Sequence, residues 1–215
     1  MILMFKNNLP FQSDIIYEAI ITTYDQEKQS NAAPMGFIVN KEKQVIIKPY
    51  KESDTYKNLR NQKECIINIT HDPDLFVKST LFQDFLIDDF FIESSIINAP
   101  ILKACKENHL ALKVIKEKKE EDRGVYYCKI IQANLKKEYI QPYTRAFSSL
   151  IEILIHSTRV IYFSQIDGSN NPKVKQLMEL IEHHSQIIFR VTQEHSQYQK
   201  HVKEILKKIS QEVEE

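Results

Sequence analysis

The chain has 215 residues, of which 42% are hydrophobic and 27% are charged, a composition typical of a globular protein rather than of a disordered one. Lysine plus arginine and aspartate plus glutamate each number 29, so the formal net charge is zero and nothing in the balance indicates a nucleic-acid or membrane partner. The three glycines, Gly36, Gly124 and Gly168, are too few for the glycine-rich fingerprints of Rossmann and P-loop nucleotide sites.

Several classes of site and location are not expected. The apolar run at residues 1–5 is too short for a signal peptide, and no later segment is expected to reach the length of a membrane span, so we expect a cytoplasmic protein. The cysteines are widely spaced without a C-x-x-C pair, which predicts buried apolar roles for Cys65, Cys105 and Cys128. The neighbours His183 and His184 do not share a helix face, and we expect no metal site.

The first half of the chain reads as strands joined by short turns. Residues 15–24 are rich in β-branched and aromatic side chains and predict a strand that forms a hairpin with a second strand from Ala32. A polar turn at 41–43 leads to a third strand that ends near Tyr50. A short helix from Ser53 or Asp54 then precedes a fourth strand.

A second helix and a long hairpin follow. Asp72 as N-cap and Pro73 at the first helical position predict a helix to about residue 82. Residues 83–93 are either a half-buried loop that closes one mouth of a barrel or a lid whose Phe85, Phe90 or Phe91 covers a flat ligand, and we favour the loop. Leu110, Leu112 and Val114 alternate with polar residues, and residues 125–135 are a second apolar strand. The charged tip between them, at 116–124, turns near 122–124 and predicts a hairpin that would complete an antiparallel barrel.

The helix expected over residues 142–163 carries four charged or histidine side chains. Glu152 and His156 are four residues apart and share a helix face, with Arg145 before them and Arg159 after them. One interpretation makes an arginine an anion clamp and His156 a proton donor. The other is an internal network of Glu152, His156 and arginine that pins the helix to the barrel, which we favour for Glu152 and His156; the two interpretations are even for Arg145.

Residues 167–172, D-G-S-N-N-P, read as a linker. After it, apolar residues recur at helical spacing and predict two amphipathic helices. We therefore expect one domain over residues 1–166 and a helical segment over 167–215 that packs on the barrel or on a dimer partner.

The residues most typical of a small-molecule binding site lie between 31 and 70. The corner Ala33, Pro34, Met35 and Gly36 lacks bulky polar side chains, and Gly36 allows close approach of a ligand or of another strand. The helix start that follows carries the polar donors Ser53, Thr55 and Asn58 beside free backbone N–H groups that favour an anion. A flat apolar ledge beside an anion pocket suits a phosphorylated aromatic cofactor. The alternative is a bulged strand and a capped helix without a ligand.

Four motifs carry a resemblance to a known family. They are N-A-A-P-M-G-F at 31–37, S-D-T-Y-K-N-L at 53–59, N-I-T-H-D-P-D-L-F at 68–76 and T-R-x6-E-x2-I-H-x-T-R at 144–159. Together they resemble the archaeal family called domain of unknown function 447, over roughly residues 14–162. The resemblance implies a mainly β protein with helices (α+β), the FMN-binding split β-barrel, and a homodimer whose interface completes each flavin site.

The resemblance also implies which residues bind FMN. The flavin would lie against Ala33, Pro34, Met35 and Gly36, and its phosphate near Ser53, Thr55 and Asn58, with Lys48, Tyr50 and Arg145 as further candidates. A lysine at the phosphate-side strand position leaves no bidentate clamp there.

The implied activity is that of an FMN-dependent oxidoreductase that acts on an unknown small acceptor, with NAD(P)H or another small redox partner as donor. The catalytic residues are unknown, because no protein nucleophile or general base stands out. A non-catalytic flavin carrier and a ligand-free interaction module are the alternatives.

Overall fold

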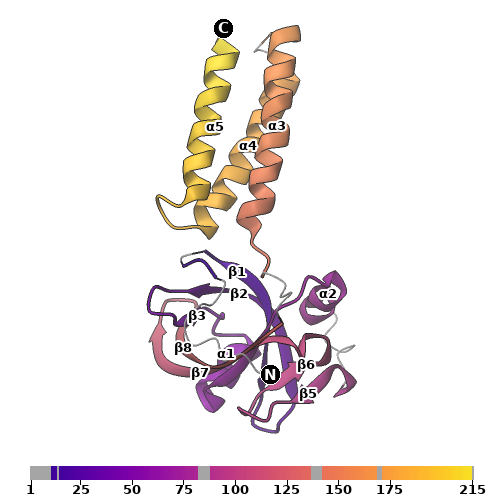
Figure 1. Cartoon of the computed structure of the whole chain (residues 1–215), viewed down its shortest axis with the longest axis vertical. Coiled ribbons are helices and arrows are strands. Elements are labelled where there is room, and N and C mark those ends of the chain that lie inside the picture. The colour runs from indigo at the N-terminus through magenta and orange to yellow at the C-terminus, as the bar shows by residue number, and fades with distance from the viewer. Residues whose placement is uncertain (1–10, 14, 82–87, 137–141, 169–170, 215) are drawn as a thin grey trace. The chain divides into compact units, whose positions relative to one another are not determined.

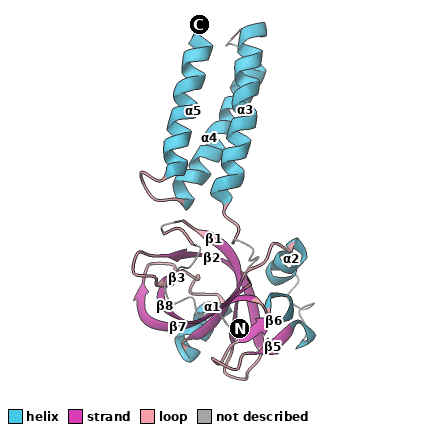
Figure 2. Cartoon of the chain, viewed as in Figure 1, coloured by secondary structure: helices cyan, strands magenta, loops and turns pink. Residues whose placement is uncertain are grey.

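The computed structural model describes residues 11–13, 15–81, 88–136, 142–168 and 171–214. The chain separates into two compact units, Met1–Tyr143 and Thr144–Glu215. The first unit holds all of the named strands and the second is helical (Figure 2). The division falls before the long helix that we expected to belong with the barrel up to residue 166, because this helix packs against the two helices that follow it.

The first unit is built on a closed antiparallel barrel (Figure 1). Its strands, in order around the barrel, are β1 (Tyr17–Tyr24), β2 (Ser30–Val39), β3 (Val45–Ile47), β8 (Gly124–Leu135), β7 (Asn108–Lys119) and β4 (Glu64–Asn68). Pairing of β4 with β1 closes the ring, so the barrel leaves no open edge between its first and last strands. This arrangement confirms the predicted antiparallel barrel.

Tight turns set the register of the barrel strands. Between β1 and β2, the Asp25 carboxylate accepts hydrogen bonds from the backbone N–H groups of Glu27 and Gln29, both at 2.8 Å. In the next hairpin the Asn40 side chain accepts from the Gln44 N–H at 2.8 Å. These local bonds fix which residues face each other, and thus which side chains enter the core.

The barrel core is apolar and includes cysteines. Tyr126 and Phe37 are the largest of its fully buried side chains. All three cysteines of the chain are described, and each is buried and free, as the sequence predicted. Cys65 and Cys128 lie side by side, and their contact together with burial raises the pKa of the Cys65 thiol. Burial raises the pKa of the Cys105 thiol to about 12, so it is not a reactive thiolate at neutral pH.

Two capped helices join the strands of this unit. Helix α1 (Asp54–Gln62) begins after Ser53, whose side chain accepts a hydrogen bond from the Tyr56 N–H. Helix α2 (Pro73–Leu81) begins after Asp72, whose side chain accepts from the Asp74 N–H at 2.9 Å. Both predicted helix starts are confirmed.

The segment expected to close one barrel mouth is partly described. A short helix, η2 (Asp88–Phe90), leads into β5 (Phe91–Glu93), which pairs with β6 (Pro100–Leu102); η3 (Lys103–Cys105) follows. Phe91 is buried in a cluster with Ile20 and Leu75, and Phe90 packs against it. Phe91 is therefore part of the core, whereas Phe85 lies outside the described residues.

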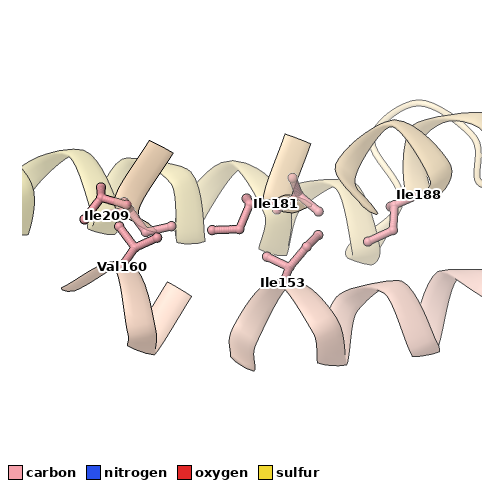
Figure 3. Close-up of a cluster of buried hydrophobic side chains, with 7 residues drawn as sticks. Ile153, Val160, Ile181, Ile188 and Ile209 are labelled. Atoms are coloured by element: carbon pink, nitrogen blue, oxygen red, sulfur yellow. The ribbon is translucent and has the colours of Figure 1, made fainter. Parts of the chain in front are cut away.

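The second unit is formed by α3 (Arg145–Asp167), α4 (Pro172–Val191) and α5 (Gln197–Glu214). Thr144 caps α3, and Asn171 caps α4 with Pro172 in its first turn. The two helices after the predicted linker agree with the sequence prediction, whereas residues 169–170 of that linker lie outside the described residues. The apolar faces meet in one core (Figure 3), whose members are Ile153, Val160, Val174, Ile181, Ile188, Val202 and Ile209.

Helix α3 is more apolar than expected. Its segment Arg145–Ile166 has a mean hydropathy of 1.2 and is long and apolar enough to cross a membrane by length and composition alone. The expectation that no segment reaches that length is therefore wrong. Only 28% of this segment is buried, and its large exposed apolar side chains are Phe147, Ile151, Leu154, Ile155, Tyr162 and Ile166. Core helices of soluble proteins can be equally long and apolar. Ile153 and Val160 of this helix pack against the other helices of the unit.

Candidate functional site

The predicted apolar ledge is the middle of β2. Ala33, Pro34, Met35 and Gly36 are all half-buried and pair with β1, with Gly36 opposite Glu18. A Cβ atom on Gly36 would lie 2.7 Å from Ile16 Cγ2. The close approach seen at this glycine is therefore that of the Ile16 side chain, which lies just before β1.

Behind this ledge, α1 places two of the predicted phosphate donors in a buried polar network. Thr55 and Asn58 are 1% and 4% exposed. Asn58 Nδ2 donates to Thr23 Oγ1 at 3.0 Å, and Asn31 Nδ2 donates to Thr55 Oγ1 at 3.1 Å and to Thr23 Oγ1 at 3.4 Å. The network therefore ties α1 to the end of β1 and the start of β2. Sequence reasoning missed Thr23 and used Asn31 only as part of a motif.

The rim of the site is the turn before α1. Ser53 donates to the Tyr50 carbonyl from both its backbone N–H, at 3.1 Å, and its hydroxyl, at 2.7 Å. This turn brings Tyr50 beside the start of α1, where the first N–H groups have no carbonyl partner within the helix. Lys48 is exposed and forms an ion pair with Glu120 at 3.3 Å.

Arg123, which was not among the predicted site residues, also lies at this rim. The tip of the β7–β8 hairpin pairs with residues 49–51, where the backbone N–H of Gly124 donates to the Pro49 carbonyl at 3.0 Å. The Arg123 guanidinium carbon lies 3.8 Å from the centroid of the Tyr50 ring, Nη1 donates to the Lys48 carbonyl, and Nη2 contacts the Tyr50 hydroxyl. A guanidinium is thus present beside the lysine, although the strand position itself carries no arginine. An isolated bridge between Tyr50 and Arg123 reflects the same pairing.

Acidic side chains form ion pairs with the lysines at this rim and so offset part of its positive charge. Asp54, in the first turn of α1, forms an ion pair with Lys57 at 3.0 Å, and Glu120 pairs with Lys48. These pairs are exposed, so each contributes about 0 to 1 kcal/mol and can rearrange when an anion binds.

The last predicted residue, Arg145, does not belong to the barrel unit. It is the first residue of α3 in the helical unit, whereas the other candidates lie in the barrel unit. Its role in cofactor binding stays a prediction.

A family model for the N-terminal domain of proteins of unknown function DUF447 matches residues 17–137 of this sequence, which span the whole barrel. The chain belongs to the DUF447 family. The resemblance drawn from the four sequence motifs is thereby confirmed.

Solved structures place this DUF447 chain in a known fold. An FMN-bound DUF447 protein from Methanosarcina mazei is 24% identical, with 90% of this chain and 95% of that chain covered and a TM-score of 0.50. The flavin reductase HpaC, solved with NADP+, is 16% identical over 62% of this chain and 88% of its own, with a TM-score of 0.52. A Streptomyces globisporus NADH:FAD oxidoreductase, solved with NAD and FAD fragments, is 10% identical over 60% and 79%, with a TM-score of 0.51. The fold is the split β-barrel of flavin reductases, with helices added, as predicted.

The residues of the barrel site are chemically suited to a flavin phosphate. The Thr55 hydroxyl is an acceptor for Asn31, so its own proton is available to a further acceptor. The helix start, this hydroxyl and the Arg123 guanidinium are all groups that stabilise an anion. The half-buried β2 corner adds an apolar surface of small residues. The donor set therefore fits the phosphate of a flavin cofactor.

A second polar cluster lies in the helical unit. His156 Nε2 is 3.8 Å from Glu152 Oε2 on α3, and the His156 and His184 rings have centroids 6.1 Å apart. The network expected to pin this helix to the barrel stays a prediction. Burial, followed by the nearby His183, lowers the pKa of His184, so its imidazole is neutral at pH 7. The sequence could pair Glu152 with His156 from their spacing, but only helix packing brings in His184.

Proposed function

We propose that this DUF447 chain is an FMN-binding flavoprotein and a flavin-dependent oxidoreductase. The observation that carries the proposal is the polar network of Thr23, Asn31, Thr55 and Asn58 that involves helix α1, with Arg123 stacked on Tyr50 in the turn before that helix. This arrangement joins a helix N-terminus, a hydroxyl donor and a guanidinium, which are the groups that bind a phosphate ester.

The relatives support the choice of FMN over other phosphorylated ligands. The DUF447 protein from Methanosarcina mazei is described as FMN-bound, and 90% of the present chain is covered by it. Two flavin enzymes of the same fold were solved with NADP+ or with NAD and FAD fragments. A nicotinamide donor is therefore part of the proposal.

In this proposal the barrel residues bind and orient the cofactor. The α1 start, Thr55 and Arg123 hold the phosphate, with Lys48, Tyr50 and Ser53 at the rim. The flavin ring lies on Ala33, Pro34, Met35 and Gly36, where small side chains allow close approach and exclude water from one face. Bound FMN supplies two-electron transfer between a reduced donor and a small acceptor.

A homodimer that completes each flavin site belongs to the same proposal. The exposed apolar side chains of α3 supply a surface suited to burial in an assembly, because contiguous exposed apolar residues commonly mark interaction sites. Size-exclusion chromatography with light scattering tests this point directly, and a monomer at all concentrations contradicts it.

The central experiment is flavin retention followed by reduction. The purified protein is incubated with FMN, desalted, and scanned for flavin absorbance; it is then mixed with NADH or NADPH without oxygen. We expect bands near equal stoichiometry that either nucleotide bleaches. Retained flavin that neither nucleotide reduces indicates a carrier, and a colourless protein with no measurable FMN affinity rejects the whole proposal and favours an interaction module.

A further inference from the structure

Three side chains of the helical unit form a polar cluster that the proposed flavin site does not use. Glu152 and His156 project from one face of α3, and His184 comes from α4. One potential ligand atom from each residue lies within 4.8 Å of the other two. His156 Nε2 lies 3.8 Å from Glu152 Oε2.

The His156 imidazole is unusual because one of its buried ring nitrogens lacks a hydrogen-bond partner among the described residues. The residue is 9% exposed, and its Nδ1 atom is buried with no hydrogen-bond partner among the described residues. The other ring nitrogen, Nε2, is too far from Glu152 for a hydrogen bond. Buried polar nitrogens in proteins almost always have a partner, and a missing one commonly indicates an ion or water.

The neighbours of this imidazole have the chemistry of metal ligands. His184 Nδ1 is 3.5 Å from Ser149 Oγ, an arrangement in which a hydroxyl can orient one ring nitrogen while the other faces a ligand. The Glu152 side chain is 47% exposed, so it can rotate toward the two rings. Two imidazoles and one carboxylate are a common protein ligand set for zinc, with the fourth position left to water.

We propose that Glu152, His156 and His184 form a binding site for a divalent transition-metal ion, with zinc as the expected occupant, that joins α3 to α4. Imidazole ligands favour zinc and similar ions over magnesium and calcium. Ligand atoms in a tetrahedral zinc site lie about 3.4 Å apart, whereas the three ligand atoms here lie within 4.8 Å of one another, so binding draws the groups together by about 1.4 Å at most. Rotation of Glu152 and His184 supplies this movement, because neither side chain is fully buried.

The site links two helices whose packing already defines the unit. Ile153 and Ile181 are fully buried on either side of the α3–α4 contact (Figure 3). A metal bound next to this core stabilises the folded helical unit by mass action, because the unfolded chain does not hold the three ligands together. Metal binding should therefore raise the unfolding temperature of the protein.

The test uses the untagged full-length chain after treatment with a chelator. Zinc is titrated by calorimetry, and cobalt(II) is added separately to report a four-coordinate site by its visible absorption. We expect one ion per chain and a rise in unfolding temperature. Loss of a residue that only supports a metal ligand lowers metal affinity by about 10- to 100-fold. We therefore expect His184→Ala to weaken zinc binding by at least about 100-fold, and Glu152→Gln by at least about 10-fold.

The adjacent residue provides a matched control. His183 lies on the same helix but outside the cluster, so His183→Ala should leave zinc affinity and the cobalt spectrum unchanged. Circular dichroism of each metal-free variant, recorded in the presence of chelator, checks that its helices are intact. If a variant has lost helix, His156→Gln is tested in its place. The proposal is overturned if wild-type protein shows no saturable binding, or if His183→Ala weakens binding as much as His184→Ala. Neither outcome depends on flavin binding.

Discussion

Asn58 Nδ2 donates a hydrogen bond to Thr23 Oγ1 across 3.0 Å and so ties helix α1 to strand β1. Both side chains are buried, with 4% and 0% exposure. The bond thus supports the wall beside the proposed phosphate site.

Replacement of Asn58 should first of all lower stability. Asn58→Ala leaves the Thr23 hydroxyl without this donor and opens a small cavity, so we expect the free energy of unfolding to fall by about 1 to 3 kcal/mol. Urea denaturation measures the change. An unchanged midpoint would show that the buried network does not stabilise the barrel.

Two variants of Thr55 distinguish the structural role of this network from a role in ligand binding. Thr55→Val removes the hydroxyl at nearly constant shape, whereas Thr55→Ser keeps it. If the hydroxyl donates to the FMN phosphate, a charge-assisted bond of about 1.5 to 3 kcal/mol is lost and affinity falls by about tenfold or more in the valine variant alone. Fluorescence titration with FMN provides the measurement. Equal affinity of the two variants would remove Thr55 from the site.

Arg123 should contribute to flavin affinity more than to stability. Its side chain is 35% exposed, and stacking on Tyr50 at an exposed position is worth about 0.5 to 1 kcal/mol. We expect Arg123→Ala to weaken FMN binding by about tenfold, with partial recovery in Arg123→Lys, which keeps the charge but not the planar fork. The effect should shrink at high salt. A salt-independent result would contradict a role in phosphate binding.

Gly124 should tolerate no side chain. A Cβ atom there would lie 2.5 Å and 2.7 Å from atoms of the Tyr56 ring and 2.9 Å from Tyr126. Because both rings are buried, Gly124→Ala should destabilise the barrel by about 1 to 3 kcal/mol. Gly36→Ala is the matched comparison: its nearest contact is the half-buried Ile16 side chain, which can shift, so we expect a smaller loss of thermal stability.

His109 should make the barrel less stable in mild acid. Burial lowers the pKa of His109, and its Nδ1 lies 3.2 Å from the Cys105 carbonyl oxygen. Below about pH 6.5, the ordinary histidine pKa, the unfolded chain binds a proton that the folded chain does not, so stability falls as the pH drops from there toward the folded-state pKa. The dependence should be weaker in His109→Asn, which keeps a donor near the carbonyl. Urea midpoints between pH 5 and pH 8 measure the difference.

Local patterns in the sequence predicted most of the elements of this fold. Ser53 and Asp72 mark helix starts because capping depends on neighbours within three residues, and alternation of apolar residues predicted the strands because one face of each enters the core. The motifs around Ala33 to Gly36 and Ser53 to Leu59 also led to the correct family.

Tertiary structure alone decided which distant side chains meet. Hairpin pairing places Arg123 on Tyr50, and the strand and helix contacts engage Asn58 with Thr23; neither follows from spacing along the chain. The same holds for His184 beside His156, and for α3, which joins α4 and α5 because its buried isoleucine and valine face those helices. Local sequence determines caps and periodicity, whereas contacts between residues far apart depend on how complete elements pack.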